Sequence, residues 1–169
     1  MRLLIVFIFL MSNSFANEAI DIKNLIIHKE LKKYDSLTFL NAKKDQLDLD
    51  NYQGNLILLN FWATWCLPCK EEMPSLDLLQ QNEDLDNLKI FPINVGQENL
   101  EKTLIFFKDL KIENLKIYHD SPITLAKKLG LRGIPTTVLL NKNGFEFARI
   151  VGSIDFNNKE FIEWLKKYN

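Results

Sequence analysis

Cysteine and histidine are scarce in this sequence, because its 169 residues contain only two of each. Neither sign of charge is in clear excess, with 21 Lys and Arg against 22 Asp and Glu. This balance argues against a basic surface that binds nucleic acid or an anionic membrane. The sequence also has no internal repeats and no low-complexity stretch, which excludes solenoid and tandem-repeat folds.

The longest apolar run lies at the start of the chain. Residues 3–11 are all apolar, and they follow Arg2 and precede the small residues Ser14 and Ala16. A basic start, a short apolar core and small residues before a cleavage point are typical of a secretory signal peptide. We therefore expect a signal peptide over residues 1–16, cleaved after Ala16, and an exported mature protein. An uncleaved membrane anchor is the alternative, although the run is short for a bilayer span.

Both cysteines belong to one motif, Cys66-Leu67-Pro68-Cys69. The apolar residues 56–62 before it indicate a buried strand, and the segment after it indicates a helix. A helix start offers unpaired N–H groups and the positive end of the helix dipole, which stabilise a thiolate. Cys66 is therefore the predicted nucleophile that attacks disulfides. Cys69, one helical turn further on, is the predicted resolving thiol.

Other uses of the two thiols remain as alternatives. A structural zinc site needs about four ligands, and His28 and His119 have no ligand-like spacing. A purely structural disulfide over so short a loop would remove little chain entropy. A copper site favours further soft donors, and Met73 is the only one close in sequence. A non-enzymatic copper-binding or interaction module thus stays open.

Strands and helices alternate along the remaining chain. Residues 17–35 show no clear period, so we expect an N-terminal arm that packs weakly or forms a short helix. We expect strands at 37–40, 46–49, 56–62, 89–95, 115–118, 136–140 and 145–151, and helices at 66–81, 99–110, 121–129 and 157–167. This order predicts one three-layer α/β domain over residues 36–169 with a mixed sheet.

Two longer motifs carry a family resemblance. They are Asn-Phe-Trp-Ala-Thr-Trp-Cys-Leu-Pro-Cys-Lys-Glu-Glu-Met-Pro at 60–74 and Leu-Gly-Leu-Arg-Gly-Ile-Pro-Thr-Thr at 129–137. In this order they resemble the thioredoxin superfamily, and more closely the TlpA/ResA/CcmG-type periplasmic disulfide reductases, over roughly residues 36–168. The resemblance implies a thioredoxin fold, α/β/α with a mixed central sheet, an N-terminal β-hairpin at 37–49 and a β-α element inserted within 96–130.

The resemblance also implies further site residues. Pro135 matches a cis-proline that faces the dithiol in this family, and the backbone of Ile134 would pair with the substrate strand. Glu72 matches an acidic residue one helical turn after the resolving thiol Cys69. A partly buried carboxyl there would have a raised pKa and could serve as general acid or base. Asn60 stands where thioredoxins carry a buried aspartate.

Two assignments near the motif have simple alternatives. Glu72 is either this acid–base group or a solvated helix carboxylate, and Glu71 on another face is its natural control. Trp65 is expected to be partly exposed as an apolar platform that binds partners, whereas Trp62 is expected in the core.

Together these features predict an exported thiol-disulfide oxidoreductase that uses Cys66 and Cys69 to reduce disulfides in periplasmic client proteins. The resemblance implies apocytochrome c or a copper chaperone as client, a membrane electron donor of the DsbD/CcdA type and no cofactor beyond the dithiol. We expect a monomer. A disulfide oxidase or isomerase is the alternative, since Leu67 and Pro68 do not fix the reduction potential. A peroxidase is disfavoured, because Ala63 stands where peroxiredoxins carry Thr or Ser.

Overall fold

The computed structural model describes residues 22–169, so the expected signal peptide and its cleavage point lie outside the described residues. The strands are β1 Leu25–Lys32, β2 Thr38–Asn41, β3 Gln46–Asp48, β4 Leu56–Trp62, β5 Leu88–Asn94, β6 Tyr118–His119, β7 Thr136–Leu140 and β8 Glu146–Val151. The helices are α1 Leu67–Leu79, α2 Leu100–Asp109, α3 Leu125–Lys128 and α4 Lys159–Lys166, with a 3-10 turn at Leu49–Tyr52. None of the helices within 22–169 has the length and apolar character needed to cross a membrane.

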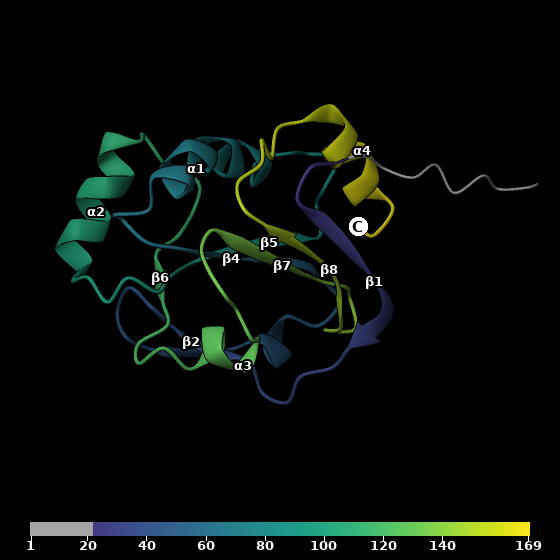
Figure 1. The fold of residues 1–169 in the computed structure, drawn as a ribbon, viewed down its shortest axis with the longest axis horizontal. Coiled ribbons are helices and arrows are strands. Elements are labelled where there is room, and N and C mark those ends of the chain that lie inside the picture. Colours follow the sequence, from purple (N-terminus) through teal and green to yellow (C-terminus); the bar gives the residue numbers. More distant parts are fainter. Residues whose placement is uncertain (1–21) are drawn as a thin grey trace, which may run out of the picture.

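The strands form one sheet in the order β1-β8-β7-β4-β5-β6-β2-β3. Strand β4 pairs parallel with β5 and antiparallel with β7, so the sheet is mixed. Figure 1 shows α1 and α4 over one face of the sheet and α3 on the other. The predicted three-layer α/β/α architecture is therefore confirmed, and so is the N-terminal hairpin, now seen as β2 and β3.

Strand β4 is the centre of the core, because all seven of its residues are buried. Successive side chains of a strand point to opposite faces of the sheet. Leu58 and Trp62 accordingly belong to the apolar cluster that contains residues of α1, whereas Ile57 and Phe61 belong to the cluster on the α3 side. The same alternation places Asn60 on the α1 face, where a buried polar side chain needs a hydrogen-bond partner.

Two predicted elements are shorter than expected. Residues 115–117 do not form part of β6, and α3 spans only 125–128 of the predicted 121–129 helix. The carboxylate of Asp120 accepts hydrogen bonds from the backbone N–H groups of Thr124, Leu125 and Ala126. These N–H groups are the ones that lack a partner within the helix at its start. Asp120 therefore makes α3 begin at Leu125 and not at the predicted residue 121.

The N-terminal segment differs from the expected weakly packed arm or short helix. Residues 25–32 form strand β1, which pairs antiparallel with β8 and extends the sheet at one edge. Most of its side chains are exposed to solvent on both faces of the strand. Such an edge strand lacks the alternation of apolar and polar residues by which a strand is recognised in a sequence.

A buried carboxylate joins this strand to the sheet. Glu146 of β8 has no exposed surface. It accepts hydrogen bonds from His28 Nε2 at 2.6 Å, Tyr34 OH at 2.6 Å and Arg149 Nε at 2.8 Å. Burial acts to raise the pKa of Glu146, but the donors from Arg149, Tyr34 and His28 outweigh it and the pKa lies below its usual range. The side chain is therefore an ionised anchor for β1.

Replacement of this anchor tests its contribution to stability. Glu146→Ala leaves the Arg149 guanidinium half-buried without its counter-charge, so we expect the free energy of unfolding to fall by about 3–5 kcal/mol. Urea titration followed by circular dichroism measures the loss. The control Glu30→Ala removes an exposed carboxylate of β1 and should change stability by less than about 0.5 kcal/mol. Equal effects of the two substitutions would contradict the assignment.

Candidate active site

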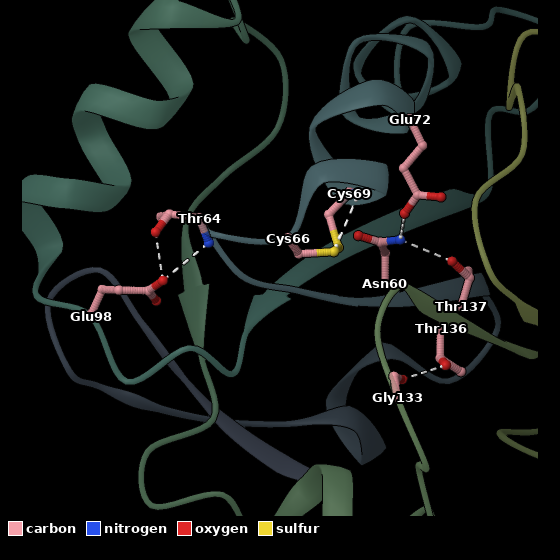
Figure 2. Close-up of a disulfide and its surroundings, with 9 residues drawn as sticks. All are labelled: Asn60, Thr64, Cys66, Cys69, Glu72, Glu98, Gly133, Thr136 and Thr137. Carbon is pink, nitrogen blue, oxygen red and sulfur yellow. Dashed lines mark hydrogen bonds between the residues drawn. A yellow bond between two sulfur atoms is a disulfide. The ribbon is translucent and has the colours of Figure 1, made fainter.

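The two cysteines lie where the central strand passes into the first helix. After β4 the chain makes a tight turn, in which the Cys66 N–H donates to the Ala63 carbonyl at 3.1 Å. Cys66 is the N-cap residue of α1, and its sulfur accepts the Cys69 N–H at 3.3 Å. Cys66 and Cys69 form a disulfide with an S–S distance of 2.06 Å. Figure 2 shows this disulfide at the start of α1.

The two sulfur-bearing residues differ in their access to solvent. Cys66 keeps 5% of its surface exposed and Cys69 none. The roles of nucleophile and resolving thiol stay predictions. Beside Cys66, the side chains of Trp65 and Leu67 are 68% and 65% exposed. Trp62 is fully buried, as predicted. An incoming disulfide would therefore meet Cys66 on an apolar rim, while Cys69 remains behind it.

Glu72 is buried on the inner side of α1, at 2% exposure, and is not the solvated carboxylate of the alternative assignment. Its Oε1 accepts a hydrogen bond from Asn60 Nδ2 at 2.7 Å, and the same amide group donates to Thr137 Oγ1 at 2.9 Å. In Figure 2 the oxygen end of the Asn60 side chain points toward the disulfide. Asn60 thus lies among the carboxyl, the disulfide and strand β7.

Burial raises the pKa of Glu72 from 4.5 to about 7. Hydrogen bonds from Asn60 and from the Ile154 backbone act in the opposite direction but are too few to compensate for the lost hydration. The neighbouring Glu71 is exposed. Near neutral pH Glu72 can therefore exist in either protonation state, which is the property that acid–base chemistry at the second sulfur requires.

The second motif lies at the start of β7. The Ile134-Pro135 peptide bond is cis, as predicted. Ile134 is half-buried and contacts the apolar clusters on both faces of the sheet. Thr136 Oγ1 donates to the Gly133 carbonyl at 2.8 Å, which closes the turn around the proline (Figure 2). Thr137 Oγ1 accepts a hydrogen bond from Asn60, which in turn donates to Glu72.

One contact at the site could not be predicted from the patterns in the sequence. The carboxylate of Glu98, in the loop between β5 and α2, accepts hydrogen bonds from the backbone and the side chain of Thr64. Thr64 lies in the turn before Cys66. No periodicity or motif connects positions so far apart in the chain, so only the fold reveals this pair.

Comparison with known proteins gives the family. Residues 28–145 match the AhpC/TSA family. The chain belongs to this family. Thiol-disulfide oxidoreductase ResA of Geobacillus thermodenitrificans is 32% identical over 121 residues, which cover 70% of this chain and 67% of that protein. The ResA of Halalkalibacterium halodurans is 29% identical over 124 residues, covering 72% and 69%.

Solved structures share the fold of this chain. Thiol:disulfide interchange protein DsbE from Chlorobium tepidum superposes with a TM-score of 0.71 at 19% identity, over 82% of this chain and 96% of that one. StoA from Bacillus subtilis superposes with a TM-score of 0.63 at 27% identity, over 79% and 96%. The chain is thus a ResA-like thiol-disulfide oxidoreductase of the thioredoxin superfamily, with the thioredoxin fold that its motifs predicted.

Among the described residues of this ResA-like chain, the side chains that could bind a metal do not form a cluster. Within residues 22–169 no three His, Cys, Asp or Glu side chains gather as a metal site would require. Met73, the soft donor considered for copper, is fully buried in the core. His28 is committed to Glu146, and His119 lies on β6, where burial lowers its pKa.

The raised pKa of Glu72 has a consequence for stability. An acid whose pKa is higher in the folded state makes unfolding easier as it ionises, so stability should fall as pH rises from 4.5 to about 7. Glu72→Gln should remove this decline, which is worth at most roughly 3 kcal/mol. Chemical denaturation of both proteins at several pH values between 4 and 8 measures the difference.

The exposed neighbour supplies the control for this measurement. Glu71→Gln should keep the wild-type dependence on pH, because an exposed carboxylate keeps its hydration in both states. An unchanged decline in Glu72→Gln would show that the carboxyl at this position does not titrate near neutral pH.

Proposed function

We propose that this protein donates electrons to disulfides in exported client proteins. The observation that carries the proposal is the pairing of Cys66, at the N-terminus of α1 beside the exposed Trp65, with the fully buried Cys69. Such an asymmetric pair suits a disulfide exchange that proceeds in a fixed order. The dithiol is itself the redox group, so the proposed reaction requires no cofactor.

The exchange consists of two displacements. The Cys66 thiolate attacks one sulfur of the client disulfide, forms a mixed disulfide and releases the first client thiolate. The Cys69 thiolate then attacks the Cys66 sulfur, closes the Cys66–Cys69 disulfide and releases the second client thiolate. The client gains two electrons and the protein loses two, and the closed disulfide of the structure corresponds to the spent form.

Glu72 is the proposed proton acceptor for the second displacement. Cys69 is buried and can attack only as a thiolate, so its proton must pass to a nearby group. Asn60 cannot titrate, whereas Glu72 lies one helical turn after Cys69 and titrates at about 7. The Asn60 amide that donates to Glu72 would hold the carboxylate in place after each transfer.

The clients and the compartment are part of the same proposal. We assign the protein to the periplasm, exported by a signal peptide over residues 1–16, and we propose apocytochrome c or a copper chaperone of oxidase assembly as client. Trp65, Leu67 and the backbone of Ile134 would contact the client segment. A monomer, reduced again by a membrane donor of the DsbD/CcdA type, completes the cycle.

A disulfide-bonded peptide that carries a Cys-x-x-Cys-His sequence tests the proposal. The reduced wild-type protein should reduce the peptide in equal amounts and end as the Cys66–Cys69 disulfide, read by mass spectrometry after alkylation. Cys69→Ser should accumulate a mixed disulfide through Cys66, because the second displacement is lost. Cys66→Ser should accumulate none.

Two outcomes would overturn the proposal. A mixed disulfide held through Cys69 would reverse the assigned roles of the sulfurs. Failure of the reduced wild-type protein to react with any peptide disulfide would exclude disulfide exchange as its function.

A further inference from the structure

The turn that carries the nucleophile is held by a carboxylate from another part of the fold. Glu98 Oε1 accepts the Thr64 backbone N–H at 3.1 Å and the Thr64 hydroxyl at 2.6 Å. Thr64 precedes the exposed Trp65 and the nucleophile Cys66. Figure 2 shows Glu98 reaching this turn from the side opposite Glu72. Among the described residues, no other charged side chain forms a hydrogen bond with Thr64.

The loop between β5 and α2 is shaped to present this carboxylate. Asn94 Oδ1 accepts the Gly96 N–H at 2.7 Å. A side chain at Gly96 would place its Cβ 2.1 Å from Glu98 Oε2, so the glycine leaves the space that the carboxylate occupies. Gln97 adopts a positive φ of 60°, a conformation that non-glycine residues seldom take, and its Nε2 donates to the Asp120 carbonyl at 3.1 Å.

The surroundings keep Glu98 in its charged form. Partial burial acts to raise its pKa, but hydrogen bonds from Thr64, the loop backbone and Asn94 outweigh burial and the pKa is lowered. His119 on β6 lines a cavity together with Glu98. Burial lowers the pKa of that imidazole, while Glu98 acts to raise it. Lys44 lines the same cavity between the hairpin and α2.

We propose that Glu98 is a positioning residue for Cys66. Its carboxylate fixes the turn at Thr64 and so holds the Cys66 sulfur at the N-terminus of α1, where the thiolate is stabilised. The segment that follows β5 is thereby part of the active site, although it contributes no reacting atom. The inference rests on the proposed role of Cys66 as the nucleophile, and it names the residue that prepares this sulfur.

Three substitutions separate positioning from charge. Glu98→Ala removes the acceptor, Glu98→Gln keeps an oxygen that can accept both bonds without charge, and Gly96→Ala displaces the carboxylate while leaving Glu98 intact. Because the displaced group is the end of a flexible side chain, Gly96→Ala should cost little stability. Glu101→Ala removes an exposed carboxylate at the start of α2 and is the matched control for charge.

The readout is the rate at which iodoacetamide alkylates Cys66, measured against pH in a full-length Cys69→Ser background. In Glu98→Ala and Gly96→Ala the pH midpoint of the rate should move upward by about 0.2 to 0.7, the range that a helix N-terminus contributes to an anion. Glu98→Gln and Glu101→Ala should keep the parental midpoint. Thermal unfolding of each variant confirms that the fold is retained.

Two results would overturn the inference. A downward shift in both Glu98→Ala and Glu98→Gln would show that the charge of Glu98 acts on the thiolate and that its hydrogen bonds do not matter. Unchanged midpoints in Glu98→Ala and Gly96→Ala would show that the turn needs no such anchor. The assay requires no client protein, so failure of peptide reduction and failure of this inference are observed separately.

Discussion

The hydrogen bond from the Cys69 N–H to the Cys66 sulfur determines where this protein can do chemistry. Strand β4, buried on both faces, leads into the turn that places Cys66 at the start of α1. The first turn of a helix has N–H groups without intrahelical partners, and a sulfur that accepts one of them is favoured as an anion. The apolar rim outside and the polar groups inside are arranged around this sulfur.

Three carboxyl groups show how burial and the number of donors together set the pKa of an acid. Glu146 has no exposed surface, yet three side chains donate to it and its pKa is lowered. Glu98 is half-buried with two bonds from Thr64, and its pKa is also lowered. Glu72 has Asn60 as its one side-chain donor, and its pKa rises to about 7. Only the poorly satisfied carboxyl is suited to exchange protons near neutral pH.

Local patterns were sufficient to predict the centre of this fold and the position of the two cysteines at the start of a helix. The bounds of β4 follow from its apolar run, whereas Glu72 was predicted from the family resemblance, and the exposure of Trp65 and burial of Trp62 were expected from their amphipathic side chains. The cis bond before Pro135 was predicted from the family resemblance alone.

The features that the sequence did not predict depend on contacts between distant parts of the chain. Strand β1 is stabilised by pairing with β8, and its exposed side chains leave no apolar alternation. The Glu98–Thr64 contact requires the loop after β5 to return to the end of β4. No periodic pattern encodes such pairs, because each depends on how the finished sheet brings the segments together.

The reduction potential of the Cys66–Cys69 couple tests the central claim most directly, since the same dithiol can donate or accept electrons. The purified protein would be equilibrated in glutathione buffers of known ratio, and the oxidised fraction would be read from thiol alkylation or from the fluorescence of Trp65. A potential near or below about −220 mV is the result that the account predicts for an electron donor. A potential near about −120 mV would contradict it and identify a disulfide-forming oxidant.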